Sequence, residues 1–87
     1  HALTIVSARE FARTGIRVNT IAPGLFGTPL LLNMPQEIQD ALAASVPYPP
    51  RFGTPEEYGK MVMTICDNVM LNGETIRLDG AIRMQPR

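Results

Sequence analysis

The sequence of 87 residues is long enough for one small domain, and 45% of its residues are apolar while 18% are charged. Eight basic and eight acidic residues balance, and the basic ones are scattered, which argues against nucleic-acid binding. The single cysteine excludes an intrachain disulfide and a thiolate zinc site, so we expect no metal. Because no apolar run has the length of a membrane span and no signal-peptide pattern opens the chain, we expect a cytoplasmic protein that binds no membrane.

The first predicted elements are a helix over residues 2–14 and a strand over residues 16–22. Gly15 stands between them, where a helix C-terminus favours a residue in the left-handed conformation. The strand is rich in β-branched residues. No N-cap residue precedes the helix, so we expect the helix to begin upstream of the sequence given.

Chain-breaking residues dominate the next segment and predict short helices separated by turns. The strand ends in a Pro-Gly pair, and Thr28 and Pro29 have the character of an N-cap and a first helical residue. A further helix is predicted over residues 35–45, where apolar side chains recur four residues apart. The segment "PYPPRFG", residues 47–53, is predicted to be a loop.

The clearest helix signal begins at Thr54 and extends to residue 69. Thr54 is a suitable N-cap, a proline follows it, and Glu57 stands at the third helical position, so the pattern predicts a capping box. The apolar residues that follow recur on one helical face. An Asn-Gly turn then leads to a short strand over residues 75–78.

The order of these elements predicts an α/β fold larger than this sequence. Two strands joined by a helical connection should be parallel. Parallel sheets need cover on both faces and normally contain more than two strands. We therefore expect this chain to pack against the remainder of its own chain in a larger α/β unit.

The sequence offers no set of residues for catalysis. His1 is the only histidine, and no base stands near a serine that could be a nucleophile. Neither tyrosine is followed by a lysine four residues on, because Phe52 and Val62 occupy those positions and the only lysine is Lys60. A phosphate-binding Gly-x-Gly-x-x-Gly loop is absent as well. We therefore assign no catalytic residue.

One candidate binding element remains at the end of the first strand. Ligands of open α/β sheets bind beyond the carboxyl ends of the strands, where Pro23 and Gly24 are expected. A glycine lets the backbone approach a ligand closely. The hydroxyl of Thr28, with the free amides of the helix after it, would suit a phosphate or a carboxamide. A plain strand–turn–helix connection explains the same residues equally well.

Three motifs in this order resemble the short-chain dehydrogenase/reductase family over the whole chain. They are "GIRVNTIAPGLFGTPLL", "RFGTPEEYGKMVMTIC" and "LNGETIRLDGAIRM". The resemblance implies an α/β fold, namely the C-terminal fragment of a Rossmann-like doubly wound parallel sheet. Residues 1–87 would form the C-terminal portion of a single NAD(P)-binding domain. The family's glycine-rich loop, catalytic Ser and Tyr-x-x-x-Lys lie upstream of the matching region, which agrees with the missing chemistry.

The resemblance also implies roles for the residues after the first strand. The residues that would contact the nicotinamide end of the cofactor are Pro23, Gly24, Leu25, Phe26 and Thr28. Residues 25–50, approximately, would form a mobile substrate lid. Its residues over an acyl chain would be Leu30, Leu31, Leu32 and Met34. Ordinary packing of a short helix is the alternative explanation of these apolar side chains.

The variants "PGLFGTPLL" and "RLDGAIRMQP" further resemble the type 2 3-hydroxyacyl-CoA dehydrogenase branch of the family, which includes 17β-hydroxysteroid dehydrogenase type 10. This implies an NAD-dependent oxidoreductase that interconverts 3-hydroxyacyl-CoA and 3-oxoacyl-CoA, and a homotetramer. In this family, the residues that select NAD or NADP at the cofactor's 2′ position lie outside this sequence. NADP as the cofactor, and an NADPH-dependent 3-oxoacyl-carrier-protein reductase as the enzyme, therefore stay open as alternatives. Another alternative is a non-catalytic structural fragment, inactive without the N-terminal part.

Overall fold

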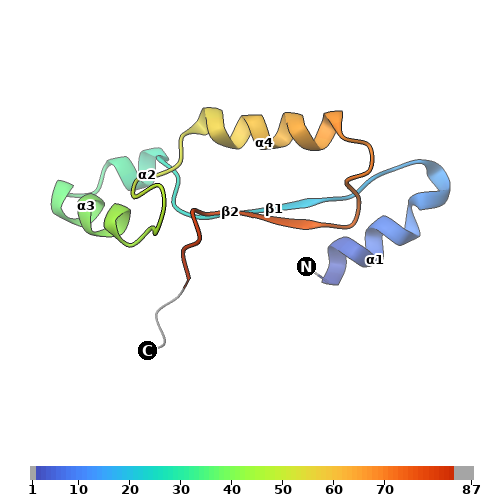
Figure 1. Ribbon diagram of the computed structural model, residues 1–87, viewed down its shortest axis with the longest axis horizontal. Coiled ribbons are helices and arrows are strands. Elements are labelled where there is room, and N and C mark those ends of the chain that lie inside the picture. The colour runs from blue at the N-terminus through green and yellow to red at the C-terminus, as the bar shows by residue number, and fades with distance from the viewer. Residues whose placement is uncertain (1, 84–87) are drawn as a thin grey trace.

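The computed structural model describes residues 2–83, so His1 and residues 84–86 of the last motif lie outside the described part. The elements in chain order are α1 (Ala2–Glu10), the 3₁₀ helix η1 (Ala12–Thr14), β1 (Thr20–Pro23), α2 (Pro29–Leu32), α3 (Gln36–Ala44), α4 (Pro55–Asp67) and β2 (Thr75–Leu78). Helix α4 lies along the two strands, α2 and α3 gather beyond one end of them, and α1 lies near the other end (Figure 1).

The two strands are parallel, as their helical connection predicts. Residues of β1 and β2 pair in register from Thr20 with Thr75 to Pro23 with Leu78. Helix α4 carries the chain back from the carboxyl end of β1 to the amino end of β2 (Figure 1). The α/β class and the pair of parallel strands are therefore confirmed.

Strand β1 begins later than predicted, at Thr20 rather than at residue 16. The Thr20 amide donates to the Glu74 carbonyl at 2.9 Å, which opens the ladder with β2. Before this point the chain faces a turn instead of a strand, and the Val18 amide donates to Asn72 Oδ1 at 3.0 Å. The β-branched residues predicted a longer strand, but a ladder forms only where a partner strand lies alongside.

The helix boundaries follow the capping residues closely. The predicted helix over residues 2–14 is α-helical to Glu10 and tightens into η1 before Gly15, which has the expected left-handed φ of 75°. Helix α3 begins at Gln36, and Pro35 is its N-cap rather than part of its first turn.

The capping box of α4 is confirmed. Oγ1 of Thr54 accepts from the Glu57 amide at 3.2 Å, and the Thr54 amide donates to Glu57 Oε1 at 2.8 Å. The helix ends at Asp67, two residues before the predicted end, with Asn68 in an extended conformation. There the guanidinium of Arg17 donates to four backbone carbonyls, those of Ile65, Cys66, Asn68 and Leu71, at 2.8–3.3 Å. These bonds occupy carbonyls at and beyond the helix end, where the last turn has no intrahelical donors.

Residues 2–83 form almost no interior among themselves. Ala8 and Val46 are the buried apolar side chains of this part, and Thr4 is the buried polar one. The radius of gyration is 15.7 Å, whereas a compact domain of this length has about 12 Å. The described residues therefore form an extended two-stranded sheet with its helices rather than a compact domain, as expected of one part of a larger parallel sheet.

Candidate functional site

A cavity of about 510 Å³ lies at the carboxyl end of β1. The turn after β1 contributes Pro23, Gly24, Phe26 and Gly27, and the start of α2 contributes Thr28, Pro29 and Leu31. The first turn of α4 closes the cavity with Pro55 and Tyr58. The structure thus brings four of the five predicted cofactor residues together with one predicted lid residue.

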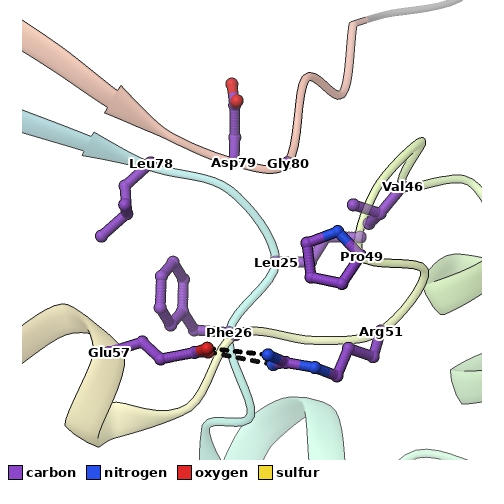
Figure 2. A pocket seen from close by; sticks show the side chains of 10 residues that line it. Leu25, Phe26, Val46, Pro49, Arg51, Glu57, Leu78, Asp79 and Gly80 are labelled. Atoms are coloured by element: carbon purple, nitrogen blue, oxygen red, sulfur yellow. Dashed lines mark hydrogen bonds and ion pairs between the residues drawn. The ribbon is translucent and has the colours of Figure 1, made fainter.

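The remaining predicted residues lie outside this cavity. Leu25 lines a smaller cavity of about 160 Å³, which Phe26 lines as well (Figure 2). The side chains of Leu30 and Leu32 are 75% and 54% exposed, and Met34 is half-buried. Leu31 is therefore the lid residue that reaches the larger cavity in this arrangement. The action of all four residues on an acyl chain stays a prediction.

Gly24 is required by the close approach of the two strand ends. A Cβ atom on Gly24 would lie 2.6 Å from Cβ of Asp79 and 2.8 Å from its Cα. The Gly24 amide donates to the Leu78 carbonyl at 3.0 Å, one step beyond the ladder. The glycine therefore has a packing reason in the neighbouring strand, in addition to the predicted approach to a ligand.

Phe26 is fixed both through its backbone and through its ring. The Gly53 amide donates to the Leu25 carbonyl at 2.8 Å, and the Gly27 amide donates to the Gly53 carbonyl at 2.9 Å, so Phe26 and Gly53 form a parallel bridge. The Phe26 ring meets Tyr58 edge-on, with centroids 5.9 Å apart and planes at 89°. A Cβ atom on Gly53 would lie 2.6 Å from Cδ2 of this ring.

Thr28 is the N-cap of α2, as predicted. Its Oγ1 accepts from the Leu31 amide at 3.4 Å, and its own amide donates to the Phe26 carbonyl at 2.7 Å. The hydroxyl keeps its proton and a second lone pair for another partner. Because Thr28 lines the cavity, it is placed to bind a polar group there.

Pro55 and Tyr58 were not predicted to belong to the site. The sequence marks Tyr58 as a member of the apolar face of the helix and shows no lysine partner for it. A crossover helix leaves the carboxyl end of one strand and returns to the amino end of the next. The first turn of α4 must therefore lie near Pro23 and Gly24, and this topological signal could have identified the third wall of the cavity.

The charged groups lie around the larger cavity rather than in it, since none of its lining side chains carries a charge. Burial raises the pKa of Asp79, but bonds from Arg77 Nε at 2.9 Å and the Ala81 amide at 3.1 Å outweigh it and hold this pKa below its ordinary value. Bonds from Arg51 lower the pKa of Glu57 to about 2. Both carboxylates are therefore ionised at neutral pH.

The described part of the chain offers neither a metal-binding cluster nor a helix that could span a membrane. Between residues 2 and 83, no three His, Cys, Asp or Glu side chains gather where they could hold a metal ion. Among the helices of this range, none has both the length and the apolar character to cross a membrane.

Comparisons with known proteins agree with this geometry. The chain is 60% identical over 84 residues to 3-hydroxyacyl-CoA dehydrogenase type-2 of Mus musculus and 58% identical to the Homo sapiens protein of that name. Each alignment covers 97% of this chain and 32% of the relative, so the chain spans about a third of the relatives' length. The crystal structure of 3-hydroxyacyl-CoA dehydrogenase type-2 from Mycobacterium avium matches with a TM-score of 0.93 and 44% identity, over 99% of this chain and 33% of that one.

A family model covers nearly the whole chain. It is described as Enoyl-(Acyl carrier protein) reductase and matches residues 1–82. The matched range includes the Pro-Gly turn, the capped helix α4 and strand β2. The chain belongs to the short-chain dehydrogenase/reductase family.

Proposed function

We propose that this chain is the C-terminal part of a single NAD(P)-binding domain in an NAD-dependent oxidoreductase that interconverts 3-hydroxyacyl-CoA and 3-oxoacyl-CoA. One observation carries the proposal. The cavity at the carboxyl end of β1 is lined by Pro23, Gly24, Phe26 and Thr28, in a chain 60% identical to a protein named 3-hydroxyacyl-CoA dehydrogenase type-2. Ligands of parallel sheets bind at this end of the strands.

The lining of the cavity fits the nicotinamide end of the cofactor. Phe26 and Tyr58 offer uncharged aromatic surface, and the Thr28 hydroxyl can bond the carboxamide. Gly24 and Gly27 present backbone without side-chain bulk beside it. When bound, NAD supplies the acceptor for the hydride that leaves C3 of the hydroxyacyl substrate.

The residues of this chain orient and enclose the reactants. The lining of the cavity includes no histidine, carboxylate or lysine, and its tyrosine, Tyr58, has no lysine four residues on, so we assign none of these residues as the acceptor of the substrate hydroxyl proton. We assign that step to the Tyr of the family's Tyr-x-x-x-Lys motif, outside this sequence. Leu30, Leu31, Leu32 and Met34 would exclude water and contact the acyl chain. The approximate lid boundaries at residues 25 and 50 belong to this proposal.

The proposal extends to the partners of this segment. Fourteen large apolar side chains of residues 2–83 are exposed, on α1 and α4 among other places. Contiguous apolar surface normally marks a contact with another element or subunit. We propose that the remainder of the chain and the other subunits of a homotetramer pack against this surface. An isolated 87-residue chain would then be a non-catalytic fragment.

The decisive assay is steady-state reduction of acetoacetyl-CoA by the full-length protein. We expect turnover with NADH and much slower turnover with NADPH. A protein that leaves acetoacetyl-CoA unchanged but reduces a 3-oxoacyl-carrier-protein with NADPH would overturn the proposal. That result would establish the alternative activity, which the carrier-protein name of the family model also supports.

A further inference from the structure

Backbone hydrogen bonds of Gly53 connect the two ends of the lid segment. The bonds between Gly53 and residues 25 and 27 close a loop, and α2 and α3 lie within it. Figure 1 shows both helices beyond the end of the sheet, connected to it through this region. The position of Gly53 therefore sets the backbone of residues 25–27, on which the nicotinamide would lie.

Arg51 and Glu57, which stand on either side of Gly53 in the sequence, form an ion pair. Nη1 and Nη2 of Arg51 donate to Oε1 and Oε2 of Glu57 at 2.9 and 2.7 Å, a two-pronged contact (Figure 2). Glu57 also accepts from the Thr54 amide, and Arg51 Nη1 also donates to the Phe52 carbonyl at 2.9 Å. The residues on both sides of Gly53 are thus held by the same pair of side chains.

Neither charged group touches the larger cavity. Arg51 and Glu57 line the smaller cavity, whereas Phe26 lines both. The Phe26 ring fills the space beside Gly53 that a Cβ atom would need. A displacement of Gly53 must therefore move Phe26, and with it the wall that would face the nicotinamide.

We propose that the Arg51–Glu57 pair is a positioning device that holds the turn Leu25–Gly27, through Gly53 and Phe26, in the conformation that receives the nicotinamide ring. This inference rests on the proposed function. The pair makes no contact with the larger cavity, so it acts through other residues and is not catalytic. The bonds from Arg51 lower the pKa of Glu57, so the pair is charged at neutral pH.

A purely structural role predicts a different outcome. Exposed ion pairs contribute little to stability, and Arg51 and Glu57 side chains are 50% and 41% exposed. A role limited to stability would change the melting temperature slightly and leave ligand binding intact. A positioning role changes the binding of the nicotinamide half of the cofactor and spares the adenosine half.

The experiment compares the dissociation constants of NADH and ADP-ribose for the full-length protein. Arg51→Met and Glu57→Gln are expected to weaken NADH binding about tenfold, the change that follows when contacts with the nicotinamide worth about 1.4 kcal/mol are lost. ADP-ribose, which lacks the nicotinamide, should bind unchanged. Arg51→Lys keeps the charge but loses the two-pronged geometry and should lie in between.

Glu56→Gln is the matched control, because it removes an acid from the same helical turn and Glu56 forms no ion pair among residues 2–83. It should bind both ligands as the wild type does. Equal affinities of Arg51→Met and wild type for NADH, or an equal loss for NADH and ADP-ribose, would overturn the inference. A wild-type protein that binds neither NADH nor NADPH would refute the proposed function itself, and the inference with it.

Discussion

Replacing Gly24 with alanine is expected to lower the unfolding free energy of the full-length protein by about 3 kcal/mol. The added Cβ would lie 2.8 Å from Cα of Asp79, and backbone cannot rotate away as a side-chain end can. The ends of β1 and β2 must separate, which breaks the bond from the Gly24 amide to the Leu78 carbonyl. The cavity wall at Pro23 and Gly24 moves with them, so NADH binding should weaken as well.

Urea unfolding of Gly24→Ala beside Gly59→Ala tests this expectation. Gly59 lies within α4, and among the described residues no heavy atom lies within 4 Å of its added Cβ. Inside a helix alanine is favoured over glycine by about 0.5–1 kcal/mol, so Gly59→Ala should not lower the unfolding free energy as Gly24→Ala does. A Gly24→Ala protein as stable as the wild type, with unchanged affinity for NADH, would show that the strand ends tolerate separation.

Replacing Arg17 with methionine is expected to lower the unfolding free energy by about 2–3 kcal/mol. The change removes four hydrogen bonds from a charged donor to carbonyls at the end of α4 and the turn after it. It also removes a positive charge from the negative end of the helix dipole. The end of α4 and the segment before β1 should then be held together less firmly, by the bonds that remain from Val18 to Asn72 and from Asn19 to Leu71.

Arg13→Met is the control for this change, since Arg13 is exposed and forms no ion pair among residues 2–83. We expect its unfolding free energy to stay within about 0.5 kcal/mol of the wild type. Arg17→Lys should recover the charge but only part of the bonding, because an ammonium cannot match the fork of the guanidinium. Equal unfolding midpoints for Arg17→Met and Arg13→Met would contradict the anchoring role.

Local signals predicted the fold well where the determining contacts are local. The capping box joins Thr54 to a residue three positions later, and Gly15 ends its helix through its own φ angle. The contacts of Arg17 with α4 join residues at least 48 positions apart in the sequence, so no local pattern predicts them. The late start of β1 has the same origin, because the ladder depends on where β2 lies.

The candidate site was predicted in part for similar reasons. The strand-end rule and the family motifs pointed to Pro23, Gly24, Phe26 and Thr28, which the structure gathers around one cavity. Leu25 stands at a bend beyond the end of β1 and lines the smaller cavity instead. Tyr58 comes from α4, and its position depends on the crossover rather than on its neighbours in sequence. The contacts of all five residues, Pro23, Gly24, Leu25, Phe26 and Thr28, with a cofactor stay predictions.

The crystal structure of the full-length protein with bound NADH tests the central claim most directly. We predict that the nicotinamide ring lies in the cavity at the carboxyl end of β1, against the backbone of residues 23–26. Its carboxamide should lie within hydrogen-bonding distance of Thr28 Oγ1. A bound NADH whose nicotinamide lies away from this turn, with the cavity filled by another part of the chain, would contradict the account.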